Sequence, residues 1–252
     1  MTKPVDSPLQ SLEKGGFPFQ TAIRQIIRRS PGCSVLRSEY AWRDSEHSDN
    51  FLDIVARKNR FVIPIECKKT IKETFIFLRP LGEPTTTDHI KDFRGVETNY
   101  TPTTGYPDIK HSFETWQILP MSPSCEFCVV GNSNERDQRL LEKDASKLVR
   151  ATDALSGDRL ELSKLYENIS TGVLVPVIVT NAKIYTALYD PPNISLETAK
   201  FTSPPQIVPD RWVRFTKSFT AEHGNDFGNR SVFVVNSTSF QEFLGALEFS
   251  RY

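Results

Sequence analysis

The segment from Asn50 to Thr70, NFLDIVARKNRFVIPIECKKT, constrains the fold of this chain more than any other stretch. It holds two runs of strand-forming residues, 51–56 and 61–67, on either side of the polar tetrapeptide RKNR. Runs of this kind joined by a short polar loop predict a β-hairpin. We expect the register that makes one whole face of the hairpin apolar. Its pairs are Leu52 with Ile65, Ile54 with Ile63, and Ala56 with Phe61.

The opposite face of the predicted hairpin gathers two carboxylates and a lysine. Asp53 lies diagonally across from Glu66, with backbones about 7–8 Å apart, so the tips of the two side chains can share a metal ion. Lys68 follows Glu66 by two residues and points the same way, whereas Cys67 points into the apolar face. Pro64 cannot donate to a ladder and is expected at an edge, a bulge or a non-donating position.

An aspartate, a dozen intervening residues and then Glu66-Cys67-Lys68 at the end of an apolar strand resemble the core motif of the PD-(D/E)xK, or restriction-endonuclease-like, nuclease superfamily. The resemblance implies an α/β fold whose mixed central sheet is flanked by helices. It also implies a metal-dependent endonuclease that hydrolyses phosphodiester bonds, with DNA as the expected substrate.

The same resemblance implies a role for each residue of the motif. Asp53 and Glu66 would be catalytic ligands of Mg²⁺, for which Mn²⁺ can substitute, and Lys68 would orient the attacking water or help to deprotonate it. The chemistry agrees, because Mg²⁺ prefers carboxylate oxygens, activates a nucleophile and neutralises charge on the phosphate. A lysine beside the metal would stabilise that phosphate charge as well.

Other interpretations remain open at this point. The bare spacing also fits a surface hairpin with a charged face, and the fold alone does not guarantee activity. The main alternative is therefore a non-catalytic nucleic-acid-binding or assembly protein on the same fold. A hydrolase with a different pocket is a third possibility, although the sequence contains no G-x-S-x-G motif and no zinc-type histidine cluster.

The third acidic position of the site is less defined. FPFQTAIRQIIRRS, at 17–30, has the apolar spacing of a helix with one buried stripe. Relatives in the resembled superfamily often supply a carboxylate from such a helix, but Gln20 occupies the corresponding place here. Glu39, in the predicted strand 33–42, is our candidate third metal ligand, with an exposed strand residue as the alternative.

The rest of the chain is expected to elaborate one domain. Residues 1–16 are predicted to form a flexible leader, and 17–252 a single domain with an insertion at about 78–131 and a C-terminal extension at about 191–252. The insertion contains aromatic residues that favour packing and basic residues that could line a phosphate path, and we expect it to serve recognition, dimerisation or structure alone. These residues are Tyr100, Tyr106, Phe113, Trp116, His89, Lys91, Arg94, Lys110 and His111.

Further elements follow from periodicity. We expect a helix at 134–155, a strand buried on both faces at 172–180 and a neighbouring strand at 182–189. Strands at 211–219 and 231–236 are expected at the edge of the same sheet, and Ser239 is expected to cap a helix at 239–247. RWVRFTKSF, at 211–219, could make a basic stripe for nucleic acid, or a strand with one solvated face.

Charge and composition limit the partners. Lys+Arg and Asp+Glu balance at 31 each, so nucleic acid would need a local patch rather than an overall field. No run of about 18 apolar residues and no signal peptide is found, and we expect a cytoplasmic protein without membrane contact. The chain could also pair with a second copy of itself as a homodimer. Four cysteines include a lone CxxC at 125–128, which favours buried thiols over zinc, since structural zinc needs four ligands.

Overall fold

The computed structural model describes residues 15–43, 48–70, 74–82, 94–100, 107–112, 118–119, 124–131, 140–158, 171–218 and 229–249. The described helices are α2 (Phe17–Arg29), α3 (Leu140–Gly157) and α5 (Phe240–Ala246), with short 3₁₀ turns η2 (Pro191–Asn193) and η3 (Ser237–Ser239). The first strands are β1 (Cys33–Arg43), β2 (Asp49–Lys58), β3 (Phe61–Lys68), β4 (Thr74–Pro80), β5 (Arg94–Tyr100), β6 (Pro107–Ser112), β7 (Ile118–Leu119) and β8 (Ser124–Cys125). The later strands are β9 (Phe127–Gly131), β10 (Thr171–Leu174), β11 (Val177–Thr180), β12 (Lys183–Tyr189), β13 (Gln206–Asp210), β14 (Trp212–Ser218), β15 (Asn229–Asn236) and β16 (Glu248–Phe249).

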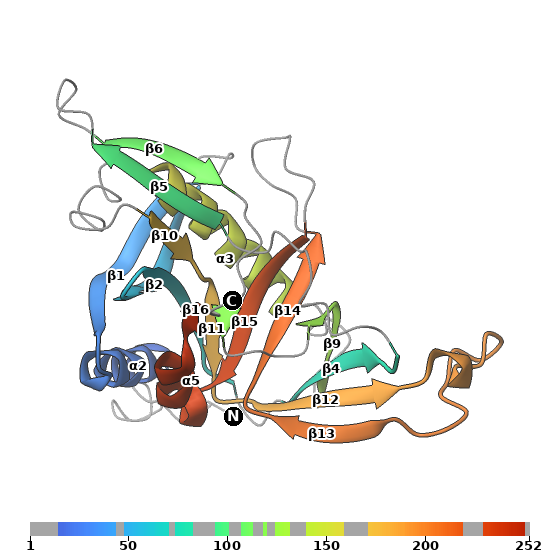
Figure 1. Cartoon of the computed structure of the whole chain (residues 1–252). Coiled ribbons are helices and arrows are strands. Elements are labelled where there is room, and N and C mark those ends of the chain that lie inside the picture. Colours follow the sequence, from blue (N-terminus) through green and yellow to red (C-terminus); the bar gives the residue numbers. More distant parts are fainter. Residues whose placement is uncertain are drawn as a thin grey trace.

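The protein is an α/β fold with mixed sheets flanked by helices (Figure 1). A large sheet runs β6-β5-β10-β3-β11-β15-β14-β8, and the hairpin β1–β2 continues from β3. A second sheet has the order β13-β12-β4-β9, and β16 pairs with β7 in a third. β11 is parallel to both β3 and β15, whereas β2 is antiparallel to β3. Along the chain, α2 precedes the strands β1, β2 and β3, and α3 precedes β11, which is parallel to β3, with additional strands between β3 and α3.

Two apolar cores lie on opposite faces of the large sheet. One core joins β2, β3 and β11 to α2 and α5, through residues such as Ile23, Ile63 and Phe243. The other joins the same sheet to α3 and to the second sheet, through residues such as Leu148, Val62 and Phe77. The large sheet is consequently the middle layer, with α2 and α5 on one side and α3 on the other.

The predicted hairpin forms, but its register differs by two residues. Ile54 pairs with Ile65 and Ala56 with Ile63, and only Asn59 and Arg60 remain in the turn. The expected pairs of Leu52 with Ile65, Ile54 with Ile63 and Ala56 with Phe61 are therefore wrong. A shift of two leaves every side chain on its original face, because side chains alternate with a period of two. The apolar pattern alone could not distinguish these registers.

Lys58 explains why the strand extends into the predicted loop. Its side chain is buried, and its ammonium donates to the carbonyl oxygens of Gly245 at 2.9 Å and Leu247 at 2.8 Å, and also to that of Leu244. The last carbonyl groups of a helix have no donors within the helix, so Lys58 provides hydrogen-bond donors for the carbonyl groups at the end of α5. This contact fixes the β2 end of the hairpin against a segment nearly two hundred positions later in the sequence.

We expect Lys58→Met to lower the free energy of unfolding by about 2 kcal/mol, because hydrogen bonds to a charged group are lost and the carbonyls at the end of α5 stay buried without donors. Urea denaturation measures the change. Lys183→Met removes an exposed lysine from β12 and should change stability by less than about 0.5 kcal/mol. Equal effects of the two substitutions would contradict this role of Lys58.

Leu52 is buried as expected, but on the other face. It belongs to the α3-side core together with Val55, whereas Ile54, Ile63 and Ile65 line the α2-side core. The β1–β2 pairing passes from Ser38 with Ile54 to Tyr40 with Leu52 without a pair at Glu39 and Asp53. Glu39 has a φ of 57°, a left-handed conformation that interrupts the alternation. β2 therefore changes faces between Ile54 and Leu52, and Tyr40 lies with Leu52 on the α3 side.

The run 172–180 is buried along its whole length as predicted, but it forms two strands rather than one. β10 and β11 pair with β3 in the same register, which places Pro176 opposite Pro64. Neither proline has an N–H group, so the ladder is interrupted where they face each other. Pro64 thus lies in an interior strand, opposite another residue that also lacks a backbone N–H group.

Other expectations about the sheets need correction. β12 does not join the large sheet but pairs with β4 and β13 in the second sheet. β15 is not an edge strand, because β11 and β14 lie on its two sides. Segment 78–131 supplies β5, β6, β7, β8 and β9 to all three sheets, so its described part is built into the fold. Ser239 precedes α5 without a side-chain capping bond. Residues 1–14 of the predicted leader lie outside the described residues.

Candidate functional site

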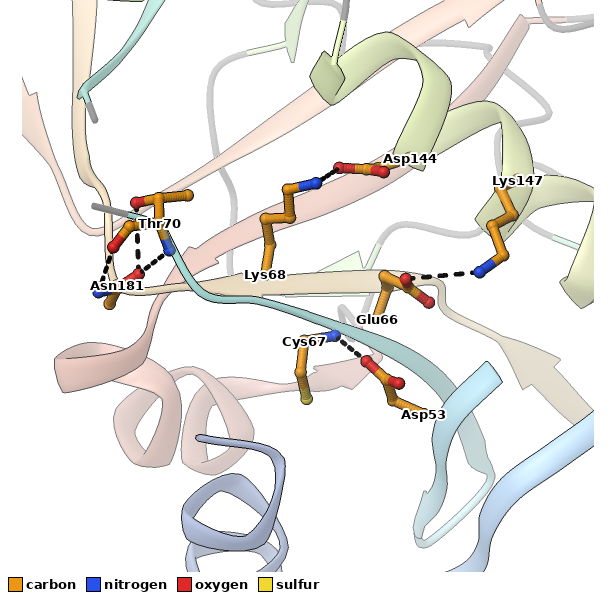
Figure 2. A network of polar contacts seen from close by, with 8 residues as sticks. All are labelled: Asp53, Glu66, Cys67, Lys68, Thr70, Asp144, Lys147 and Asn181. Carbon is orange, nitrogen blue, oxygen red and sulfur yellow. Dashed lines mark hydrogen bonds and ion pairs between the residues drawn. The ribbon is translucent and has the colours of Figure 1, made fainter. Parts of the chain in front are cut away.

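Glu66 and Lys68 occupy the last residues of β3 and point toward α3 (Figure 2). Their neighbours on β11 are Ile178 and Thr180, which lie in the interior of the large sheet. Cys67 lies between them and packs against the α2-side core, as the alternation predicted. The end of β3 therefore presents one carboxylate and one ammonium group from the same face of a half-buried strand end.

Asp53 lies where β2 separates from β3. The last described pair is Ile54 with Ile65, so Asp53 is the next residue, at the level of Glu66. Its carboxylate accepts a hydrogen bond from the backbone N–H of Cys67 at 2.7 Å (Figure 2). Its own carbonyl accepts from the side-chain amide of Gln20 at 2.8 Å. Asp53 is thus held beside the backbone of β3, and its position is set by β3 and α2 together.

Helix α3 contributes two charged side chains that the sequence interpretation did not assign to the site. Asp144 Oδ2 lies 2.7 Å from Lys68 Nζ, and Lys147 Nζ lies 3.7 Å from Glu66 Oε1 (Figure 2). Asp144 and Lys147 are three residues apart, so they lie on neighbouring positions of one helix face. Each charged residue at the end of β3 therefore has an opposite charge on α3.

Burial and like charge act together on the carboxylates. The side chain of Glu66 is only 17% exposed, and burial, followed by the negative charge of Asp53, raises the pKa of Glu66 to about 7. Burial also raises the pKa of Asp53, against the opposing effects of the Cys67 N–H group and the positive charge of Lys147. Desolvation is the largest cause of both shifts, and the positive charge of Lys147 reduces them without cancelling them.

The predicted third ligand is not assembled with the other two. Glu39 is exposed, and its charge contributes to the raised pKa of Asp53. Among the described side chains, however, no three His, Cys, Asp or Glu residues gather closely enough to hold a metal ion. The side-chain NH₂ group of Gln20 donates to the backbone of Asp53 and so holds β2 against α2. The third acidic position remains a prediction for Glu39.

Two carboxylates are oxygen donors of the kind that hard cations such as Mg²⁺ and Mn²⁺ accept. Mg²⁺ is often held by one or two carboxylates and completes its coordination with water and substrate phosphate. Asp53 and Glu66 supply carboxylate oxygens of this kind, and the neighbouring thiol of Cys67 is turned to the other face. Burial and the negative charges of Asp53 and Glu66 raise the pKa of Cys67 far above its ordinary range, which keeps this thiol protonated.

The side chain of Asn181 fixes the backbone of Thr70 next to the site. Its amide nitrogen donates to the Thr70 carbonyl oxygen at 3.0 Å, and its Oδ1 atom accepts from the Thr70 backbone N–H group at 2.7 Å (Figure 2). Asn181 thereby continues the ladder between the chain segments that leave β3 and β11. This contact restricts the backbone immediately after Lys68.

The proposed basic stripe at 211–219 does not form on one face. Lys217 pairs with Glu142 of α3, and Arg211 pairs with Glu242 of α5 on the other side of the large sheet. Arg214 and Lys217 are three residues apart on β14 and therefore lie on opposite faces of the strand, and Phe215 is buried. The side chains of His89, Lys91, Arg94, Lys110 and His111, and of the aromatic residues predicted to pack with them, lie outside the described residues.

The charges of α3 could have been noticed in part from the sequence. A helix was expected at 134–155, and in the structure Asp144 and Lys147 each adjoin a buried residue of its apolar stripe, Ala145 and Leu148. Residues at the border of a buried stripe lie close to the surface the helix packs on. The sequence did not indicate that this surface would be the end of β3.

Comparison with known proteins adds no assignment, because no family model, curated protein or solved structure matches this chain. Within the described part of the chain, no helix is both long and apolar enough to cross a membrane.

Proposed function

We propose that this protein is a Mg²⁺-dependent nuclease that hydrolyses phosphodiester bonds, with DNA as its substrate. The observation that carries the proposal is the pairing of two partly buried carboxylates, Asp53 and Glu66, whose pKa values are both raised, next to the lysine at the end of the same strand. The parallel strand β11 beside β3 and the preceding hairpin agree with the restriction-endonuclease-like core that the motif implies.

Each residue has a defined task in this proposal. Asp53 and Glu66 would hold the Mg²⁺ ion, which supplies an activated water and neutralises charge on the phosphate. Lys68 would orient the water, and its ammonium would stabilise the negative charge that develops on the phosphate oxygens. Lys147 contributes positive charge near both carboxylates and would meet the substrate from the α3 side.

The test uses purified protein with supercoiled plasmid and with single-stranded oligonucleotides at pH 8, where Glu66 is ionised. We expect cleavage with Mg²⁺ or Mn²⁺ and none with EDTA. Binding in a gel-shift assay without cleavage under either ion would favour the alternative, a non-catalytic nucleic-acid-binding protein. Preference for one substrate would show whether duplex or single-stranded DNA is cleaved.

A further inference from the structure

Asp144 forms an ion pair with Lys68, the residue that would orient the attacking water in the proposed reaction. The Asp144 Oδ2 atom lies 2.7 Å from Lys68 Nζ, and the two side chains are only 19% and 29% exposed. Figure 2 shows the Lys68 side chain extended from β3 toward α3 and ending at this carboxylate. The pair is therefore a close, largely water-excluded contact rather than a loose surface ion pair.

The geometry points to Asp144 as a positioning residue for Lys68, and this inference rests on the proposed nuclease function. A lysine ammonium is carried on a flexible four-carbon stem and has no planar group that fixes its direction. Lys68 must hold one position relative to the phosphate to be useful, since small displacements of reacting groups are costly. Asp144 is anchored on α3, whose neighbouring Ala145 and Leu148 are buried in the core.

Asp144 also keeps Lys68 away from Glu66. The two residues are two apart on one strand face, about 7 Å along the backbone, which is within reach of a lysine side chain. In the structure Glu66 pairs instead with Lys147, at the looser distance of 3.7 Å. Without Asp144, Lys68 would turn to Glu66 and compete with a metal ion for its carboxylate. Asp144 thus keeps the ammonium group of Lys68 apart from Glu66, the proposed metal ligand.

A double-mutant cycle tests the inference with wild type, Lys68→Ala, Asp144→Asn and the combined variant, each measured for its single-turnover cleavage rate. We expect Asp144→Asn to lower the rate about 10–100-fold while the dissociation constant for DNA changes less than threefold. The combined variant should be no slower than Lys68→Ala, because Asp144 acts only through Lys68. Multiplying effects in the combined variant would overturn the inference.

Further variants separate positioning from structure. Asp144→Glu keeps the charge on a longer stem and should recover most of the rate lost in Asp144→Asn. If circular dichroism shows that Asp144→Asn is unfolded, Asp144→Ala takes its place in the cycle, because it also removes the charge and alanine favours a helix. Glu142→Gln is the matched control, because Glu142 is an ion-paired carboxylate of the same helix that contacts Lys217. A rate loss in Glu142→Gln equal to that in Asp144→Asn would contradict a specific role.

Metal binding gives a second readout. Calorimetry should show weaker Mg²⁺ binding in Asp144→Asn, but a smaller change when Asp144→Asn is made in the Lys68→Ala background, where no lysine can move to Glu66. Equal changes in both backgrounds would refute the separating role. If the wild type cleaves but the cycle is additive, only this inference fails. If the wild type cleaves under no divalent ion, the proposed function fails and this inference with it.

Discussion

Glu66→Ala and Asp53→Ala are each expected to lower Mg²⁺-dependent cleavage by at least about 1,000-fold. A metal ion contributes several kcal/mol of transition-state stabilisation, and about 1.4 kcal/mol corresponds to a factor of ten in rate. Either substitution removes one of the two carboxylates that the structure brings to the end of β3. Single-turnover assays and calorimetric Mg²⁺ titration would show whether rate and metal affinity fall together.

Asp53→Asn sharpens this test, because the asparagine oxygen can still accept the Cys67 N–H group that Asp53 accepts at 2.7 Å. Loss of cleavage in this variant would then result from the lost charge and not from a displaced strand. Lys68→Ala should lower turnover but leave Mg²⁺ binding largely intact, since an ammonium cannot ligate the ion. Asp49→Ala removes an exposed carboxylate from the same strand and serves as the control.

Metal-dependent cleavage that persists unchanged in Glu66→Ala, after contaminating nuclease has been excluded, would place the active site elsewhere. The same conclusion would follow if Asp49→Ala and Asp53→Ala had equal effects. Activity lost in both Asp53→Ala and Glu66→Ala with unchanged Mg²⁺ affinity would instead show that the carboxylates act without holding the ion.

Glu66→Gln is expected to stabilise the metal-free protein at pH 8 by up to about 3 kcal/mol. The pKa of Glu66 is about 7 in the folded protein against 4.5 for an ordinary glutamate, and each unit of difference corresponds to about 1.4 kcal/mol. The folded state therefore binds this proton more tightly than the unfolded chain. The stability that results is fully present below about pH 4.5 and is lost as the pH rises through about 7.

The advantage of Glu66→Gln should thus be absent near pH 4.5 and should reach its full value above pH 7. Urea denaturation in EDTA at pH 4.5, 6 and 8 measures the difference between the two proteins. Comparing the two proteins at each pH cancels the titration of groups that the substitution leaves unchanged. A variant that is less stable than wild type at pH 8 would show that Glu66 is compensated by Lys147 more completely than we infer.

Several features of the site followed from the sequence. Glu66 and Lys68 share a face because they are two apart on one strand, and this holds in any register. Ile54, Ile63 and Ile65 were expected on the opposite face and line the α2-side core. The helix at 17–30, the strand at 33–42 and the helix at 134–155 were also recognisable, because their apolar spacing is local information.

The remaining features depend on contacts between distant segments. Lys58 favours the observed register of the hairpin because its ammonium group donates to carbonyl groups at the end of α5. The hydrophobic pattern cannot select this register, since a shift of two residues leaves the pattern unchanged. Leu52 changes face where Glu39 adopts a left-handed backbone conformation. Glycine and asparagine favour that conformation, but a glutamate gives no signal of it in the sequence.

The sequence by itself determined which residues carry the chemistry of β3, because the alternation of a strand is a local property. Only the tertiary structure decided what surrounds them. The rotation of α3 on the large sheet selects Asp144 and Lys147 from the charged residues of that helix, and the point at which β2 leaves β3 places the Asp53 carboxylate at the Cys67 N–H group. These choices depend on how separate elements pack, and packing geometry is not encoded in the spacing of any one element.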